Sequence, residues 1–289
     1  MKYIDLHVHS TISDGTLTPT EVVHLAADQN LAAIALTDHD TVRGVKEALA
    51  AAKTLKKEGK FVRIIPGVEI SAEYSGRDIH ILGLFINPDS PELNAALDNA
   101  LSGRDKRNEQ MVENLRNAGI DITLEALTFG TPDTVITRAH FARYLINRGY
   151  AKNNDDAFKR YLGYDTPYYV PRTQMTPESA ISLIRDAGGL PILAHPLLYK
   201  LTLDELDALI ARLKSAGLIG IETIYSANTG FDEGIIRRYV NKYDLIMTGG
   251  SDFHGSNKPH IFLGTGKGNL KIPETILTCL EEKLFQLRS

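Results

Sequence analysis

Short apolar runs and longer amphipathic stretches alternate along most of the chain, and this alternation predicts its secondary structure. The apolar runs are rich in β-branched and aliphatic residues, which favours strands at 3–9, 32–37, 62–70, 79–86, 190–194, 219–224 and 245–248. Helical spacing of apolar positions predicts helices at 20–30, 41–57, 179–187, 203–216, 231–242 and 273–287. Strands that alternate with helices are typical of βα units.

About seven strands that alternate with helices indicate a barrel, and capping residues mark where two of the helices begin. Thr18, Pro19 and Glu21 form a capping box with proline at the first helical position, and Thr176 with Pro177 repeats the Thr-Pro opening. No Gly-x-Gly-x-x-Gly follows the first strand, so an open dinucleotide-binding sheet fits less well than a closed barrel. We therefore expect an α/β fold, a distorted (β/α)7 TIM-like barrel.

One segment interrupts this alternation. The pattern breaks at Asn87 and Pro88, and the chain stays polar and helical to about Arg172 before strands and helices resume. We expect residues 1–87 and 173–289 to form the barrel. Residues 88–172 are then an inserted, mainly helical cap that binds the substrate.

The composition excludes several classes of protein. The 289 residues include 32 Lys+Arg and 36 Asp+Glu, and 43% are hydrophobic, which is an ordinary globular balance and excludes disordered chains, collagen and coiled coils. No apolar run reaches the roughly 18 residues of a membrane helix, and Asp5, His7 and His9 interrupt any secretory signal. We expect a cytoplasmic protein. The single Cys279 cannot form an internal disulfide, and its apolar, helical surroundings predict that it packs in the core.

Histidines and carboxylates gather where the predicted strands end. His7 and His9 lie two apart on one strand, so both rings project to the same side and can bind one metal ion, although a half-exposed polar strand face would show the same pattern. The other residues of this kind, in chain order, are Asp14, Asp38, His39, Asp40, Glu69, His80, His195, Asp252 and His254. In a parallel barrel those strand ends line the catalytic face.

Each of these residues also has an ordinary structural explanation. Asp14 fits a turn beside Gly15, Asp38 and Asp40 fit helix N-caps, and His195 fits the end of a strand before a proline. Three of the carboxylates, Asp14, Glu69 and Asp252, lie with six histidines in order on one face of the barrel. This joint arrangement favours a metal site over the separate explanations. By contrast, we expect His24 and His260 to play no role at such a site, and residues 264–268 to form a turn.

These motifs resemble those of the polymerase and histidinol phosphatase (PHP) family of metal-dependent phosphoesterases. The matching motifs are DLHVHS with SDG, TDHD, PGVE with DIHILG, AHP, and SDFH. The resemblance implies a distorted seven-stranded barrel with two or three divalent ions. It implies His7, His9, Glu69 and Asp252 as ligands of a first ion, Glu69, His80 and His195 of a second, and Asp14, His39 and His254 of a third.

The ligands implied for the third ion indicate which metal is bound there. Many members of the family have histidine where this chain has Asp14, and a harder oxygen ligand favours Mn²⁺ or Fe²⁺, with Zn²⁺ as an alternative. Three divalent ions outweigh three carboxylates, so the filled site would attract an anionic phosphate ester. Such ions supply an attacking water at neutral pH; Asp252 could take its proton, and His195 or His254 could protonate the leaving oxygen.

The inserted segment is rich in arginine. Between Glu92 and Arg172 lie eight of the 16 arginines but only three of the 16 lysines, and arginine grips phosphate in a planar, bidentate fork. We expect substrate-binding residues at Arg104, Arg107, Arg138, His140, Arg143 and Arg172, although helical ion pairs with residues such as Asp105 are an alternative for each arginine. Because the same segment holds as many acidic as basic residues, long duplex DNA is not expected as a partner.

The insert also narrows the resemblance within the family. Its RAHFAR and YVPR stretches resemble the branch of nucleoside 3′,5′-bisphosphate phosphatases and 5′-to-3′ exoribonucleases, which implies a small phosphorylated nucleotide or a short RNA end as substrate. Two alternatives stay open. Histidinol-phosphate phosphatase would need an acidic pocket for its cationic substrate, and a catalytically inactive scaffold would not need the complete ligand set. The oligomeric state stays open.

Overall fold

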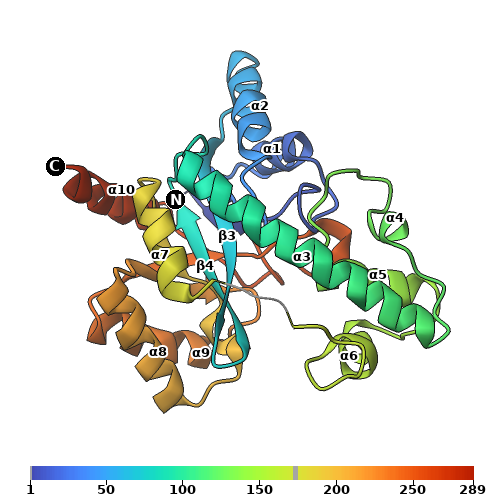
Figure 1. Cartoon of the computed structure of the whole chain (residues 1–289). Coiled ribbons are helices and arrows are strands. Elements are labelled where there is room, and N and C mark those ends of the chain that lie inside the picture. Colours follow the sequence, from blue (N-terminus) through green and yellow to red (C-terminus); the bar gives the residue numbers. More distant parts are fainter. Residues whose placement is uncertain (1, 172–174) are drawn as a thin grey trace.

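Seven strands form one mixed sheet in the computed structural model, which describes residues 2–171 and 175–289 (Figure 1). They follow one another in chain order around the sheet: β1 (Ile4–Val8), β2 (Ala33–Leu36), β3 (Arg63–Tyr74), β4 (Arg77–Leu84), β5 (Leu190–Leu193), β6 (Gly220–Tyr225) and β7 (Ile246–Gly250). Each lies within or overlaps one of the predicted apolar runs. The seven predicted strands are therefore confirmed.

The sheet curls until its first and last strands meet, which makes it a distorted barrel. His9 N donates to Phe253 O at 3.0 Å, and Asp252 N donates to His7 O at 2.9 Å. A Cβ atom on Gly250 would lie 2.2 Å from the Cβ of His7, so only glycine lets the end of β7 come this close to β1. The expected barrel is confirmed, and its seam lies at two of the predicted metal ligands.

One strand runs against the others, which is part of the distortion of this barrel. β4 is antiparallel to both β3 and β5, whereas the remaining neighbours are parallel. β3 and β4 form a long hairpin that turns at Ser75 and Gly76, both with positive φ. Glu69 and His80 therefore lie within two long strands and not at strand ends, and the antiparallel pairing places them side by side.

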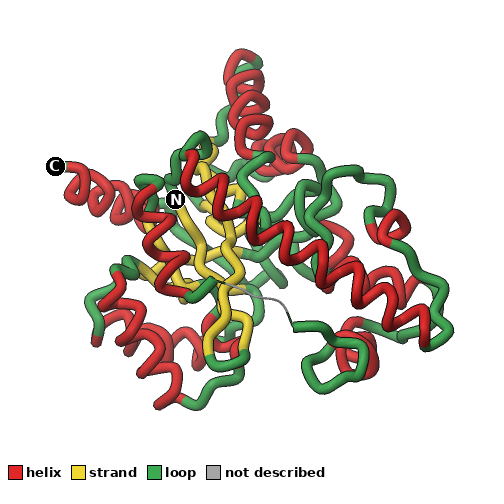
Figure 2. The backbone as a smooth tube through the Cα atoms, viewed as in Figure 1, coloured by secondary structure: helices red, strands yellow, loops and turns green. Residues whose placement is uncertain are grey.

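The helices follow the predicted order, with shifts of a few residues at their ends (Figure 2). The observed helices are α1 (Pro19–Asp28), α2 (Val45–Lys57), α3 (Pro91–Asn117), α4 (Leu124–Leu127), α5 (Arg138–Asn147), α6 (Asn154–Ala157), the π-helical η1 (Phe158–Leu162), α7 (Pro177–Asp186), η2 (Pro196–Tyr199), α8 (Leu203–Ala216), α9 (Gly230–Lys242), η3 (Gly255–Asn257) and α10 (Thr275–Arg288). Thr18 caps α1 with the predicted capping box. α2 begins four residues later than predicted, after Gly44, so neither Asp38 nor Asp40 is its N-cap.

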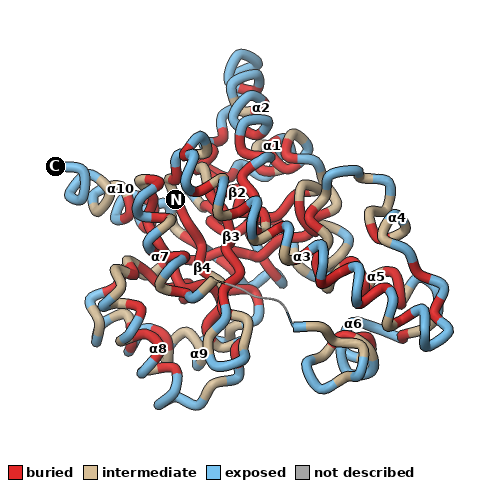
Figure 3. Tube along the Cα trace, viewed as in Figure 1, coloured by how far each residue is buried: buried red, intermediate tan, exposed pale blue. Residues whose placement is uncertain are grey.

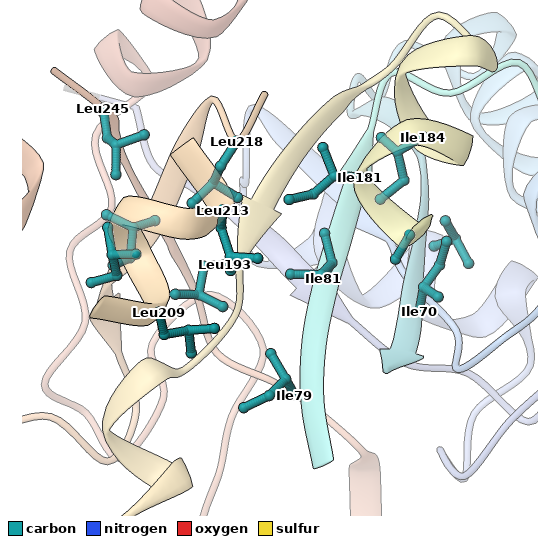
Figure 4. Packing of buried hydrophobic residues seen from close by; sticks show 14 of the residues in the cluster. Ile70, Ile79, Ile81, Ile181, Ile184, Leu193, Leu209, Leu213, Leu218 and Leu245 are labelled. Carbon is teal, nitrogen blue, oxygen red and sulfur yellow. The ribbon is translucent and has the colours of Figure 1, made fainter. Parts of the chain in front are cut away.

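Helices α7 and α8 cover one face of the sheet with apolar side chains. Ile79 and Ile81 of β4, Ile181 and Ile184 of α7 and Leu209 of α8 belong to one buried cluster, in which Ile81 lies beside Ile181 (Figure 4). These aliphatic residues are fully buried. Burying each contributes roughly 1.5–3 kcal/mol, which holds the strands in position around the site.

Helices are the main regular structure of the segment between β4 and β5 in its described part, and its long helix α3 joins two cores. α3 has 27 residues and is roughly 40 Å long. Leu93 and Leu97 near its start pack into the cluster with α7, whereas Met111 and Leu115 near its end pack with Phe141 of α5 in a separate cluster. Figure 3 shows buried positions along both halves of the helix. α3 therefore reaches from the barrel into the inserted segment.

The structure also places Cys279, the two histidines expected outside the site, and the glycine-rich turn. Cys279 is exposed, so the prediction that it packs in the core was wrong: the buried face of α10 consists of Ile276, Leu277 and Leu280. His24 and His260 are exposed, and residues 264–268 form turns as predicted. Among the helices of residues 2–171 and 175–289, none is both long enough and apolar enough to cross a membrane.

Candidate metal centre

The nine predicted metal ligands form one continuous cluster at the barrel. Glu69 contacts five of the histidines, and Asp252 and His254 link the cluster to Asp14. The nine residues come from β1, β3, β4 and the segments that follow β1, β2, β5 and β7. Most are less than 10% exposed, and only His39 and His80 are more open. The cluster is therefore held by the barrel and largely shielded from water.

Glu69 lies at the centre of the cluster. Its Oε2 atom is 3.2 Å from Nε2 of His7, 3.1 Å from Nε2 of His9 and 3.2 Å from Nδ1 of His39. Its Oε1 atom is 2.8 Å from Nδ1 of His80 and 3.0 Å from Nε2 of His195. One carboxylate thus faces ring nitrogens on both of its oxygens, which is the arrangement a carboxylate needs to bridge two ions.

Several of these buried atoms have no hydrogen-bond partner. Nε2 of His7 and His9, Nδ1 of His39 and Oε2 of Glu69 are the converging atoms among them. Burial, with the neighbouring His254, lowers the pKa of His9 to about 3, and burial lowers the pKa of His39 to about 4, so both rings are neutral near pH 7. Ring nitrogens that converge on a carboxylate oxygen and lack hydrogen-bond partners fit a divalent cation.

The charge of the surroundings also favours a cation here. Burial lowers the pKa of His7, but the carboxylates of Glu69 and Glu222 outweigh it, and that pKa lies well above its ordinary value. Burial raises the pKa of Glu69 and of Asp252, but neighbouring positive groups outweigh it and hold both pKa values well below the ordinary range. A positive charge placed among these groups, whether a proton or a metal ion, is strongly stabilised.

Asp252 and His254 form the other side of the cluster. Oδ1 of Asp252 lies 3.5 Å from Nε2 of His9 and 3.3 Å from Nδ1 of His254, and Nε2 of His254 lies 3.1 Å from Oδ1 of Asp14. Three overlapping sets have ligand atoms within 4.8 Å of one another: His9, Asp14, His39 and His254; His7, His9 and Glu69; His39, Glu69 and His80. How the ligands divide between ions stays a prediction, since His9 and His39 each lie in two sets.

Buried carboxylates outside the predicted ligand set orient these ligands. Glu222 of β6 accepts from Nδ1 of His7 at 3.1 Å and from the backbone N of His195 at 2.9 Å. Donation by Nδ1 of His7 directs its Nε2 toward Glu69. Asp38 accepts from Ser10 N at 2.8 Å and from Ser13 Oγ at 2.7 Å, which fixes the loop that carries Asp14. The prediction from sequence missed Glu222. The signal that could have found it is an acidic residue inside the apolar run GIETIY.

The backbone at the site is held in uncommon conformations. His195, Asp252 and Asp40 have φ values of 24°, 58° and 53°, in the left-handed region that non-glycine residues rarely adopt. Such conformations persist where the surrounding structure imposes them, and they concentrate at functional sites. For Asp252 the constraint is visible: its backbone N donates to His7 O, and its Oδ2 accepts from Tyr225 Oη at 2.8 Å and from Lys258 Nζ at 2.6 Å.

Three of the predicted arginines line a small pocket beside the cluster. The pocket has a volume of about 180 Å³, and its lining includes His39 and His80 together with Arg104, Arg107 and Arg138. Arg104 is almost fully buried, forms an ion pair with Asp40 and donates to Ser71 Oγ.

Arg138 is held in place by an ion pair and by aromatic rings. It pairs with Asp78 at 2.5 Å, and its guanidinium lies 4.9 Å from the centre of the Tyr164 ring and 5.5 Å from that of Phe158. The structure thus brings Arg104, Arg107 and Arg138 together next to the predicted metal ligands.

The remaining predicted substrate residues lie elsewhere. His140 is buried, and its Nδ1 accepts from Thr137 N at 3.1 Å, so it caps α5 and does not line the pocket. Arg143 stacks on Phe129 and faces a different groove. Arg172 lies outside the described residues. Thr137, which the sequence analysis missed, donates to Asp14 Oδ2 at 2.8 Å and so connects the inserted segment to a predicted ligand.

The distorted TIM barrel and its buried histidine–carboxylate cluster define a class, the barrel enzymes whose catalytic metals lie at one end of the sheet. The comparisons with known proteins narrow this class. Residues 5–170 match the PHP domain, and the chain belongs to this family. The family resemblance predicted from the sequence motifs is therefore confirmed.

Two relatives and one solved structure are similar over most of the chain. The chain is 38% identical over 281 residues to a 5′-3′ exoribonuclease of Haemophilus influenzae, covering 97% of this chain and 99% of the relative. It is 37% identical over 255 residues to a 3′,5′-nucleoside bisphosphate phosphatase of Chromobacterium violaceum, covering 88% of each. A solved structure described as an amidohydrolase from Chromobacterium violaceum, with bound sulfate and no metal, is 35% identical, covers 97% of this chain and 96% of its own, and has a TM-score of 0.86.

Proposed function

We propose that this protein is a metal-dependent phosphoesterase that hydrolyses a nucleotide carrying two phosphates or the 5′ end of a short RNA. The observation that carries the proposal is the pocket where Arg104, Arg107 and Arg138 adjoin the ligands His39 and His80. Relatives named as a 3′,5′-nucleoside bisphosphate phosphatase and a 5′-3′ exoribonuclease support it. A scaffold without activity would not need so complete a set of buried ligands.

Nine residues would hold two or three divalent ions in this proposal. His7, His9, Glu69 and Asp252 hold the first ion, Glu69, His80 and His195 the second, and Asp14, His39 and His254 the third. The oxygen ligand at Asp14 favours Mn²⁺ or Fe²⁺, with Zn²⁺ as an alternative. When bound, such ions supply Lewis acidity, which polarises the phosphoryl group and lowers the pKa of the attacking water.

The arginine pocket binds the phosphate that is not cleaved. Arg104 is fixed by Asp40 and Ser71, and Arg138 is fixed by Asp78, so both side chains are oriented before substrate arrives. A volume of about 180 Å³ suits one phosphate with part of its sugar better than a whole nucleotide. This binding would place the second phosphate of the substrate beside His39 and His80, where its ester bond is cleaved.

Asp252 and two histidines handle the protons. Tyr225 and Lys258 both donate to Oδ2 of Asp252, which leaves its Oδ1 facing His9 and His254. From there Asp252 can take the proton of the attacking water. His195 or His254 can donate a proton to the leaving sugar oxygen, and both rings lie against carboxylates of the cluster.

The test is release of phosphate from adenosine 3′,5′-bisphosphate in the presence of Mn²⁺. We expect Asp252→Ala to lower kcat/KM by at least about 1000-fold, because it removes a ligand and a proton acceptor together. Asp204→Ala, at an exposed aspartate of α8, is the matched control and should retain the activity of the unaltered enzyme. Metal content of both variants, measured by mass spectrometry, separates loss of metal from loss of chemistry.

Two outcomes would contradict the proposal. One is an Asp252→Ala variant with nearly full activity. The other is a folded, Mn²⁺-loaded enzyme that releases nothing from the bisphosphate or from 5′-phosphorylated RNA. Release from histidinol phosphate alone would favour that alternative substrate, which three arginines beside the site argue against.

A further inference from the structure

A second, larger groove opens beside the metal centre. It has a volume of about 710 Å³ and lies between α5, residues 152–155 before and within α6, and the loop 256–260 after β7. His254, a predicted metal ligand, lies at its inner end. The groove has about four times the volume of the arginine pocket, and it falls within the range of sites that enclose a ligand of nucleotide size or more.

The groove and the arginine pocket open on different faces of α5. Ala139 borders both spaces, whereas Arg138 lines only the pocket and Arg143 lines only the groove. Successive helical residues are rotated by about 100°, and residues 139, 143, 146 and 147 share the face that lines the groove. A substrate at the metal ligands can therefore extend in two directions, into the pocket and along the groove.

The charged groups of the groove suit a chain of phosphates. Arg143, Lys152 and Lys258 line it, and Asp155 is the carboxylate among its described lining residues. Arg143 stacks its face on Phe129, 3.9 Å from the ring centre, which leaves the N–H groups on its edge free to bind a phosphate. Lys152 is exposed, and Lys258 contacts Asp252, so positive charge extends from the metal centre to the open end of the groove.

The uncharged polar side chains of the groove are mostly amides. Asn147 of α5, Asn154 of α6 and Asn257 after β7 line it. Amide side chains can both donate to and accept from ribose hydroxyls and base edges. No tryptophan, tyrosine or phenylalanine lies among the described lining residues, so sequence-independent contacts to the backbone and sugar are expected in place of base stacking.

We infer that this groove binds the part of a single-stranded RNA that lies beyond the cleaved bond, on the 3′ side of the nucleotide held at the metal centre. The inference rests on the proposed function and deepens it: the preferred substrate is an RNA of several nucleotides, and a bisphosphate nucleotide uses only the pocket. Contact with about three phosphates predicts that the logarithm of the affinity falls with the logarithm of salt concentration with a slope of about −2.

The test measures binding in the full-length Asp252→Asn variant with Mn²⁺, so that the RNA is not consumed. The probes are a 5′-phosphorylated pentaribonucleotide with a 3′ fluorophore and, as its competitor, adenosine 3′,5′-bisphosphate. We expect the pentanucleotide to bind at least about tenfold more tightly than the bisphosphate. Adding Lys152→Glu or Arg143→Ala should bring the two affinities to within about threefold and make the salt slope shallower by about 1.

Lys106→Ala is the matched control, because Lys106 is an exposed cation of α3 that lines neither space. It should leave the ratio of the two affinities unchanged. The inference is overturned if the pentanucleotide binds no more tightly than the bisphosphate, or if Lys152→Glu and Arg143→Ala leave that ratio unaltered. Failure of the proposed function gives a different result, the absence of hydrolysis of both substrates by the unaltered enzyme.

Discussion

The barrel and the inserted segment hold their parts of the site in different ways. In the barrel, predicted ligands such as His7 and Asp252 are oriented by a second buried group of β6, Glu222 or Tyr225. The inserted segment has its own apolar cluster and touches the predicted ligands mainly through Thr137, with Arg104 joined to Asp40. In the proposed function, the chemistry therefore depends on a rigid, closely coupled sheet, whereas substrate recognition depends on a unit that can be altered with less effect on the metals.

The strongest test of the barrel side is Glu69→Gln. Glu69 contacts five histidines, and the amide keeps its shape but removes the charge that a bridging ligand needs. We expect kcat/KM on the bisphosphate to fall by at least about 1000-fold, a loss of roughly 4 kcal/mol of transition-state stabilisation. Glu73→Gln, an exposed position on the same strand, is the control and should behave as the unaltered enzyme. Retention of even a tenth of the activity would exclude Glu69 as a central ligand.

The strongest test of the inserted segment is Phe141→Ala. Phe141 is fully buried in the cluster that α3 and α5 share, and its removal should destabilise that segment by about 3 kcal/mol. We expect KM for the bisphosphate to rise more than about tenfold, while Mn²⁺ affinity changes less than about fivefold, measured by isothermal titration calorimetry. Phe231→Ala, at an exposed phenylalanine of α9, provides the comparison. Loss of metal binding in parallel with substrate binding would show that the two regions are not separable.

Glu222→Gln tests whether the orienting carboxylates matter. The amide keeps the volume of Glu222 but weakens its bond to Nδ1 of His7. We expect Mn²⁺ affinity to fall about 10–100-fold, the usual effect of removing such a partner. Glu233→Gln on the outer helix α9 should leave the affinity unchanged. An unaltered titration curve for Glu222→Gln would mean that burial alone positions His7.

The smallest expected effect concerns the contact between the two regions. Thr137→Val removes the hydroxyl that donates to Asp14, a loss of about 1 kcal/mol. We expect the affinity for the most weakly bound Mn²⁺ to fall about fivefold, with the other ions unaffected. Thr137→Ser restores the hydroxyl and should restore the affinity. If the valine and serine variants titrate alike, the inserted segment does not act on the ligand set through this bond.

Part of the fold could be predicted from the sequence because it depends on local patterning. The strands from β1 to β7 are short apolar runs that fit a buried sheet, and Thr18 has the side chain needed to cap α1. The reversal of β4 could not be predicted in this way. An antiparallel and a parallel buried strand have the same composition, and the difference lies in which neighbours they pair with.

In the candidate site, too, some features follow from the sequence and others only from the fold. His7 and His9 share a face because strand side chains alternate, which the sequence alone implies. The spacing of Arg138 and Arg143 places them on different faces of α5, but only the position of α5 beside the predicted ligands decides that each face lines a separate opening. Cys279 shows the same difficulty, because apolar neighbours on a helix do not say which face of the helix is covered.

The kinds of predicted ligand, their order along the chain and the family to which the chain belongs follow from the sequence alone, because they depend on residue types at fixed spacings. The folded structure was needed to show which atoms converge on Glu69, that Glu222 and Asp38 support them, and that two openings of different size adjoin the predicted ligands. The physical reason is that contacts between residues far apart in the chain arise from closure of the barrel and packing of the insert, which only the folded chain as a whole specifies.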